Sequence, residues 1–167
     1  MIDRPASRPA ASFSRRRRQV LVAAGLGALW PVAQAASAQL PVAALLADEL
    51  ARALRHGEPL VVMVSLDGCP FCHVARNNYL APLHAESRLD IVQVDMWTAR
   101  PLRDFQGQAL THDRMVRRWA IKVAPTVLFF GPGGVEVAER LVGGYLPDFY
   151  GAYLDERLQQ ARRATRV

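Results

Sequence analysis

The chain has 167 residues, with 21 lysines and arginines against 15 aspartates and glutamates, and a net charge of +6. Six of the arginines and one acidic residue lie in residues 1–38, so the rest is nearly neutral, at 15 basic against 14 acidic residues. This balance argues against a nucleic-acid-binding surface, and two cysteines are too few for a disulfide-rich scaffold.

The first 38 residues have the organisation of a signal peptide. Four arginines at 15–18 precede a short apolar run at 20–30, and Ala36-Ser37-Ala38 offers a cleavage site. The apolar run is shorter than the roughly 20 residues that a spanning helix needs. The arginine run is also compatible with a twin-arginine export signal. We therefore predict a signal peptide at 1–38, cleaved near Ala38, and a single periplasmic domain at 39–167 that is not embedded in the membrane.

The remaining chain is predicted to alternate helices and strands. The expected helices are 42–55, 69–85, 111–120 and 147–163, and the expected strands are 60–66, 90–96, 125–130 and 135–142. Pro82 is expected to kink or end the second helix, and residues 97–110 are expected to form a polar, irregular insertion. The order predicts an α/β fold in which a mixed sheet of four or five strands carries helices on both faces.

The only two cysteines, Cys69 and Cys72, stand two residues apart where the first strand meets the second helix. A cysteine just before a helix lies among free backbone N–H groups, which favour its thiolate. Pro70 suits the first helical position because its missing N–H would be unpaired there. This spacing predicts a redox-active dithiol in which Cys69 is the exposed nucleophile and Cys72 the shielded resolving thiol.

His73 and Arg76 follow Cys69 by four and seven residues, so both are expected on the same face of the helix as candidate thiolate modulators. Cys69-x-x-Cys72-His73 also matches the attachment motif of c-type haem, although four strand-like runs disagree with a largely helical cytochrome. Two thiolates with His73 could alternatively bind copper or zinc, but no fourth zinc ligand is evident. His56, His84 and His112 are expected at the surface or at helix ends.

Three motifs together resemble the thioredoxin fold. They are Cys69-Pro70-Phe71-Cys72 after a strand, Ala124-Pro125-Thr126 before one, and Gly143-Gly144-Tyr145 after the expected hairpin. With the signal sequence, the resemblance is to exported thioredoxin-like proteins such as the SoxW-type reductases. Two positions depart from thioredoxins: Met63 stands where they carry a buried aspartate, and Gly68 replaces an aromatic residue. Proton removal from Cys72 would then need water or Asp67.

The resemblance implies a thiol–disulfide oxidoreductase that needs no separate cofactor and no metal. It implies that Pro125 is cis and faces the two sulfurs, and that the Ala124 backbone pairs with an extended substrate peptide. It favours a monomeric reductase of protein disulfides, supplied with electrons by a membrane-bound redox partner. A disulfide-forming oxidase or isomerase of the same fold is the alternative.

Overall fold

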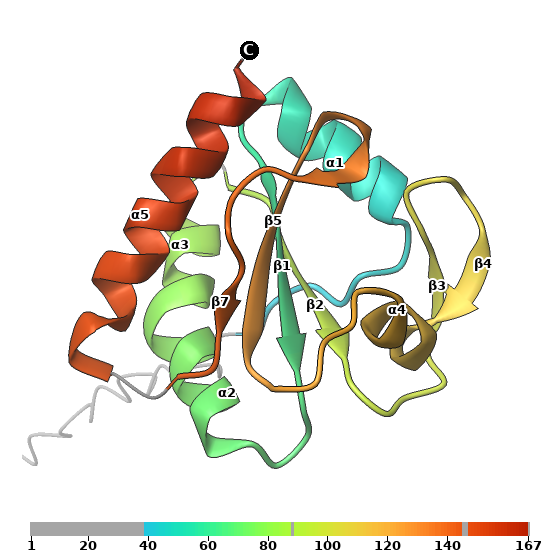
Figure 1. Ribbon diagram of the computed structural model, residues 1–167, viewed down its shortest axis with the longest axis horizontal. Helices are drawn as coiled ribbons and strands as arrows, with labels where there is room; N and C mark the ends of the chain where they lie inside the picture. The colour runs from blue at the N-terminus through green and yellow to red at the C-terminus, as the bar shows by residue number, and fades with distance from the viewer. Residues whose placement is uncertain (1–38, 88, 145–146, 167) are drawn as a thin grey trace, which may run out of the picture. The chain divides into compact units, whose positions relative to one another are not determined.

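The computed structural model describes residues 39–87, 89–144 and 147–166, so the predicted signal peptide lies outside the described residues. The central sheet has the strand order β2-β1-β5-β6, and β7 also pairs with β5. Its strands are β1 (Leu60–Ser65), β2 (Ile91–Asp95), β5 (Thr126–Gly131), β6 (Val135–Glu136) and β7 (Leu141–Val142). β1 and β2 are parallel, whereas β5 runs antiparallel to β1, β6 and β7. The sheet is mixed, as predicted, and has five strands, the larger of the two expected numbers. Figure 1 shows how its strands are arranged.

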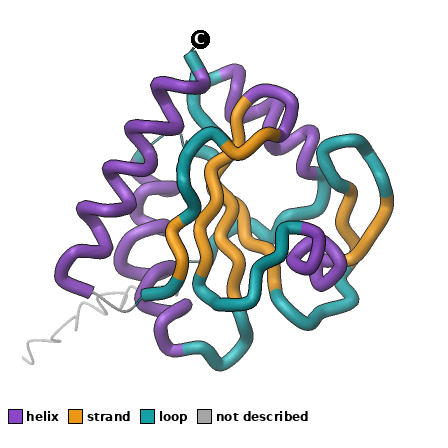
Figure 2. Tube along the Cα trace, in the orientation of Figure 1, coloured by secondary structure: helices purple, strands orange, loops and turns teal. Residues whose placement is uncertain are grey.

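Helices cover both faces of this sheet, as predicted. One face carries α2 (Pro70–Ala75), α3 (Ala81–Glu86) and α5 (Pro147–Thr165), and the other carries α1 (Leu46–Arg55) and α4 (His112–Arg118). Figure 2 shows the strands between these two groups of helices. Residues of β1 alternate between the two cores: Val61 and Met63 face α2 and α5, whereas Val62 faces α1. β1 is buried along its whole length, which explains its continuous apolar run.

The first helix begins later than predicted. Residues 42–45, expected to be helical, precede α1, which starts at Leu46; Val42 forms a bridge to Gln93 and Leu45 one to Arg103. The Gln93 N–H donates to the Pro41 oxygen over 2.7 Å, and the Ala43 N–H donates to the Gln93 oxygen over 2.8 Å. The segment therefore lies along the outer edge of β2. These backbone bonds pair the otherwise open edge of the sheet. Four residues with a helical pattern are too few to form a stable helix, so the pairing determines their conformation.

Two further expectations need correction. The insertion at 97–110 is not irregular, because β3 (Pro101–Arg103) and β4 (Ala109–Thr111) form an antiparallel hairpin within and just after it. The single strand expected at 135–142 is divided into β6 and β7, which both pair with β5. Across this division the Val137 N–H still donates to the Phe129 oxygen over 2.9 Å.

Pro82 lies inside a helix that continues past it. The five residues Arg76–Leu80 form a π-helical turn between α2 and α3, in which the Ala81 N–H donates to the Arg76 oxygen, five residues back. Because proline cannot donate the usual i to i−4 bond, a wider turn before it lets the helix proceed to Glu86. Over the part of the chain that the structure describes, no helix is both long and apolar enough to cross a bilayer.

Candidate active site

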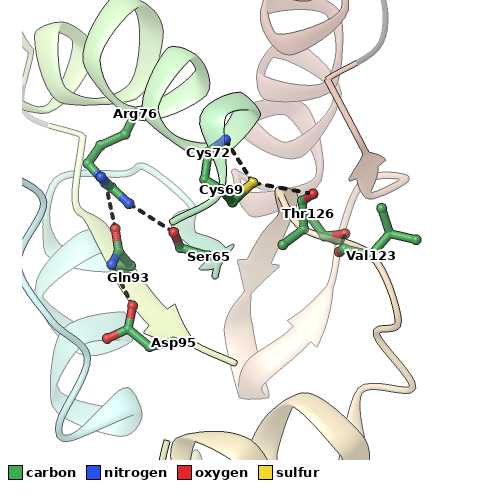
Figure 3. Close-up of a disulfide and its surroundings, with 9 residues drawn as sticks. Ser65, Cys69, Cys72, Arg76, Gln93, Asp95, Val123 and Thr126 are labelled. Carbon is green, nitrogen blue, oxygen red and sulfur yellow. Dashed lines mark hydrogen bonds between the residues drawn. A yellow bond between two sulfur atoms is a disulfide. The ribbon is translucent and has the colours of Figure 1, made fainter. Parts of the chain in front are cut away.

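Cys69 and Cys72 are joined in a disulfide at the start of α2, with their Cα atoms 5.3 Å apart (Figure 3). Cys69 is the N-cap residue, and Pro70 occupies the first turn, as predicted. The Cys72 N–H donates to the Cys69 Sγ over 3.2 Å. A backbone donor aimed at this sulfur would also stabilise a thiolate there once the disulfide is reduced.

The two sulfurs differ in access to solvent. Cys72 is fully buried, at 0% exposure, among the apolar residues beneath α2, whereas Cys69 is partly exposed. A partner molecule can therefore reach the Cys69 Sγ first. Met63, which takes the place of the thioredoxin aspartate, is also fully buried in the core that contains Cys72. Its thioether offers no proton acceptor to the Cys72 thiol beyond a weak one.

The loop that precedes β5 lies beside the disulfide. The Ala124–Pro125 peptide bond is cis, and the Ala124 oxygen lies 3.9 Å from the Cys69 Sγ. The Thr126 hydroxyl donates to the Val123 oxygen over 2.7 Å, and the Gly143 N–H donates to the Pro125 oxygen over 2.7 Å. These two bonds hold the loop beside the sulfur, although it is more than fifty residues away in sequence.

The backbone at this loop has unused hydrogen-bonding capacity. Within residues 39–87, 89–144 and 147–166, no backbone partner is found for the Ala124 N–H, which lies before the first paired residue of β5. Gly144 borders the same place: a methyl group added there would lie 3.4 Å from the Phe71 Cβ and 3.8 Å from the Pro125 Cγ. Phe71 and Gly144 therefore border the place where an extended peptide would pair with Ala124.

A small crevice beside Phe71 extends this surface toward α5. It is lined by Phe71, Val74, Tyr79, Gly144 and Tyr150, together with Ala75. Phe71 and Val74 are exposed, and the rings of Tyr79 and Tyr150 meet at a centroid distance of 4.9 Å. Burial, with a smaller contribution from Tyr79, raises the pKa of the Tyr150 phenol. Its oxygen is buried and has no hydrogen-bond partner among the residues that the structure describes. This side of the dithiol is therefore apolar.

On the other side of α2 lies a polar groove of about 420 Å³, into which both His73 and Arg76 face. The Arg76 guanidinium does not bond to a sulfur: its Nε donates to the Gln93 Oε1 and its Nη2 to the Ser65 Oγ, both over 2.8 Å. Gln93 in turn donates to the Asp95 carboxylate over 2.5 Å. Figure 3 shows that these side chains lie away from the Cys69 sulfur.

The groove has walls from distant parts of the sequence, and His112 ties them together. The Asp95 N–H donates to its Nδ1 over 2.9 Å, so its Nε2 carries the proton and donates to the Ala43 oxygen, also over 2.9 Å. His112 was expected at the surface or at a helix end. It does begin α4, but it is fully buried, because both ring nitrogens are needed to join β2 to the segment before α1.

Sequence reasoning identified Cys69, Cys72, Ala124 and Pro125, which the structure brings together at one end of the sheet. It missed the polar residues that the groove shares with His73 and Arg76, namely Ser65, Gln93, Asp95, Thr98 and Arg100. A signal for three of them was available. Ser65, Gln93 and Asp95 lie at or near the carboxyl ends of parallel neighbouring strands, which meet at the same edge of a sheet.

The site has the parts that thiol–disulfide exchange needs. Cys69 offers an accessible sulfur at the start of a helix, Cys72 is the buried second cysteine, and the loop with the cis proline lies beside them. The thioredoxin-like domain family matches residues 46–158, more than half of the chain. The chain belongs to this family and is a thiol–disulfide oxidoreductase.

Similar folds occur among solved structures. The thioredoxin pre-protein of Schistosoma mansoni is 16% identical, with 73% of this chain and 97% of that chain covered at a TM-score of 0.47. A thioredoxin from Thermus thermophilus is 25% identical, with 71% of this chain and 85% of that chain covered at a TM-score of 0.45. The Trxlp protein of Edwardsiella tarda is 20% identical, with 70% of this chain and 97% of that chain covered at a TM-score of 0.46. No curated protein sequence matches the chain.

The sequence leaves two alternatives open for the cysteine motif, namely attachment of haem and binding of a metal ion. The haem alternative requires a largely helical protein, whereas the described residues form a mixed sheet with the fold of the thioredoxin-like family. For the metal alternative, the described ranges contain no group of three or more histidine, cysteine, aspartate or glutamate side chains arranged to hold an ion. Asp67, the candidate to take the proton of Cys72, is exposed and lines the polar groove.

Proposed function

We propose that this protein is an exported reductase of protein disulfides that acts in the periplasm. The single observation that carries the reaction is the unequal access of the two sulfurs at the start of α2. The Cys69 thiolate attacks one sulfur of a substrate disulfide, and the other substrate sulfur leaves as a thiolate that takes up a proton. Cys72 then loses its proton to water and attacks the Cys69 sulfur, which releases the reduced substrate and re-forms the disulfide.

The loop at Ala124 supplies a place for the substrate backbone. A strand that pairs with the unused Ala124 N–H would bring its own cysteine to the Cys69 Sγ, which lies 3.9 Å from the Ala124 oxygen. Pro125, which follows Ala124 through a cis peptide bond, is itself buried. Main-chain pairing is independent of side-chain identity, so it supports exchange with many extended substrates.

The location and partners of the protein are also part of the proposal. The arginine run, the apolar run and Ala36-Ser37-Ala38 support export and cleavage near Ala38. The nearly neutral charge of the rest of the chain supports protein partners in place of nucleic acid. The protein acts as a monomer without a bound cofactor, and a membrane-bound redox partner returns its disulfide to the dithiol.

The first experiment is the reduction potential of the Cys69–Cys72 pair, measured against glutathione and dithiothreitol buffers, together with insulin reduction. A potential near that of thioredoxin, about −270 mV, with insulin reduction, supports the reductase. A potential near about −120 mV, with faster oxidation of dithiols, makes it a disulfide-forming enzyme. Failure of the pair to exchange with either buffer contradicts thiol–disulfide chemistry altogether.

Substrates can be captured with the variant Cys72→Ala, because the mixed disulfide on Cys69 then has no resolving thiol. Expressed with its export signal, it should accumulate disulfide-linked adducts that disappear on reduction. The matched control is Cys69→Ala, which leaves only the buried Cys72 and should trap little. Equal adducts with both variants would show that Cys69 is not the attacking residue.

A further inference from the structure

The polar groove beside α2 has no part in the exchange with an extended protein strand. Its volume, about 420 Å³, lies within the range of small-molecule sites. Residues 39, 40 and 42 form one wall, and residues 96, 98 and 100 form another. His112 joins the two walls through Ala43 and Asp95, so the groove is preformed.

Arg76 presents a guanidinium group to this groove and makes no ion pair with a described residue. It is partly buried, and its hydrogen bonds go to the neutral acceptors of Ser65 and Gln93. Across residues 39–87, 89–144 and 147–166, no carboxylate lies within ion-pair distance of it. The bonds to Ser65 and Gln93 fix the plane of the guanidinium, and Nη1 remains for a ligand. A planar guanidinium held in this way suits a carboxylate.

The groove also carries negative charge, which restricts the kinds of ligand that it can bind. Asp67 and Asp95 line it together with Arg76 and Arg100, and the Arg100 guanidinium lies 3.9 Å from the Asp95 carboxylate. A mixture of two carboxylates and two guanidinium groups disfavours a polyanion. It suits a molecule that has both carboxylate and ammonium groups, as amino acids and short peptides do.

His73 and Arg76, which line the groove, follow the dithiol along the same helical stretch, whereas Cys69 and Cys72 do not themselves line it. Cys69, Cys72, His73 and Arg76 are spaced at i, i+3, i+4 and i+7, which places them along one side of the helix. Seven residues of helix rise by about 10 Å, which is about the length of an extended tripeptide. A carboxylate at Arg76 and a sulfur at Cys69 can therefore belong to one small molecule.

We propose that this groove binds low-molecular-weight disulfides of cysteine-containing peptides, with Arg76 as the residue that receives a carboxylate. The proposal rests on the exchange chemistry proposed above and adds a substrate class to the same dithiol. The Cys69 thiolate attacks the disulfide of the small molecule, one half leaves as a thiol, and Cys72 releases the second half as the Cys69–Cys72 disulfide forms. Two electrons pass from the dithiol to the small disulfide.

The test compares two disulfide probes on the fully reduced protein: glutathione disulfide, which has carboxylates and ammonium groups, and uncharged hydroxyethyl disulfide. Arg76→Gln should lower the second-order rate constant for glutathione disulfide about tenfold, the effect of one charge-assisted hydrogen bond, and leave that for hydroxyethyl disulfide unchanged. Arg114→Gln, at an exposed position of α4 outside the groove, is the matched control and should alter neither.

Each outcome of this comparison decides the proposal. An equal loss with both probes means that Arg76 acts on the thiolate or on the fold, and it overturns the proposal; no loss with glutathione disulfide does the same. If hydroxyethyl disulfide fails to oxidise the unaltered reduced protein, the exchange chemistry itself is wrong, which separates the two failures.

A binding measurement on the unaltered, oxidised protein does not depend on a variant that folds. S-methylglutathione cannot exchange with a disulfide, so its titration reports binding alone. It should shift the amide NMR signals of Ser65, His73 and Thr98 in the groove and leave that of Ala124 in place. Shifts centred on Ala124, or none at all, would overturn the proposed site.

Discussion

Replacing Gly144 with alanine tests whether a substrate chain runs past the loop at Ala124. The added methyl group would lie 3.4 Å from the Phe71 Cβ and 3.8 Å from the Pro125 Cγ, which are ordinary contacts. The fold should therefore accept it, and the free energy of unfolding should change by less than about 1 kcal/mol, in the stabilising direction because alanine restricts the unfolded chain.

The effect on protein substrates should be larger. The methyl group occupies the space between Phe71 and Pro125, so an incoming strand must move away from Ala124. Loss of one main-chain hydrogen bond costs about 1 kcal/mol, which corresponds to roughly a fivefold fall in kcat/KM for insulin reduction. Hydroxyethyl disulfide has no peptide chain, so its rate of reaction should be unchanged.

Gly151→Ala is the control for this substitution. It also adds a methyl group at a tight position, 3.3 Å from the Tyr79 Cε1, but on α5 and away from Pro125. Insulin reduction by this variant should stay within twofold of the unaltered protein. If Gly144→Ala reduces insulin as fast as the control does, substrates do not run past the loop at Ala124 beside Gly144.

Two further predictions concern stability. Burial by itself raises the pKa of Asp104, but N–H groups of Gln108 and Gln106 and the Arg118 guanidinium outweigh it and hold that pKa below its usual value. Asp104→Asn should lower the free energy of unfolding by about 2–3 kcal/mol at neutral pH, and urea titrations should show this difference shrinking below about pH 4, as the native carboxylate is protonated; a constant difference would contradict the assignment. Tyr150→Phe removes a buried hydroxyl that has no partner within the described part of the chain, and it should raise stability by about 1 kcal/mol in the same assay, whereas a loss would mean that the hydroxyl is satisfied.

The elements that could be predicted are those with a local cause. The dithiol at the start of α2 follows from Pro70 at the first helical position and from the three-residue spacing of the cysteines. The buried strands β1 and β5 follow from continuous apolar runs. By contrast, residues 42–45 have a helical pattern but lie against β2 and β3, because backbone bonds to Gln93 and Arg103 determine their conformation.

The sequence by itself determined the buried strands β1, β2 and β5, the helix that begins after Cys69 and the identity of both cysteines, because turns, apolar periodicity and capping act over a few residues. Only the tertiary structure decided what surrounds them. The approach of Ala124 to the Cys69 sulfur depends on the register of β1 with β5, and the union of Arg76 with Ser65 and Gln93 depends on the register of β1 with β2. Contacts between distant residues are set by the pairing and packing of whole elements, and no local pattern records that pairing.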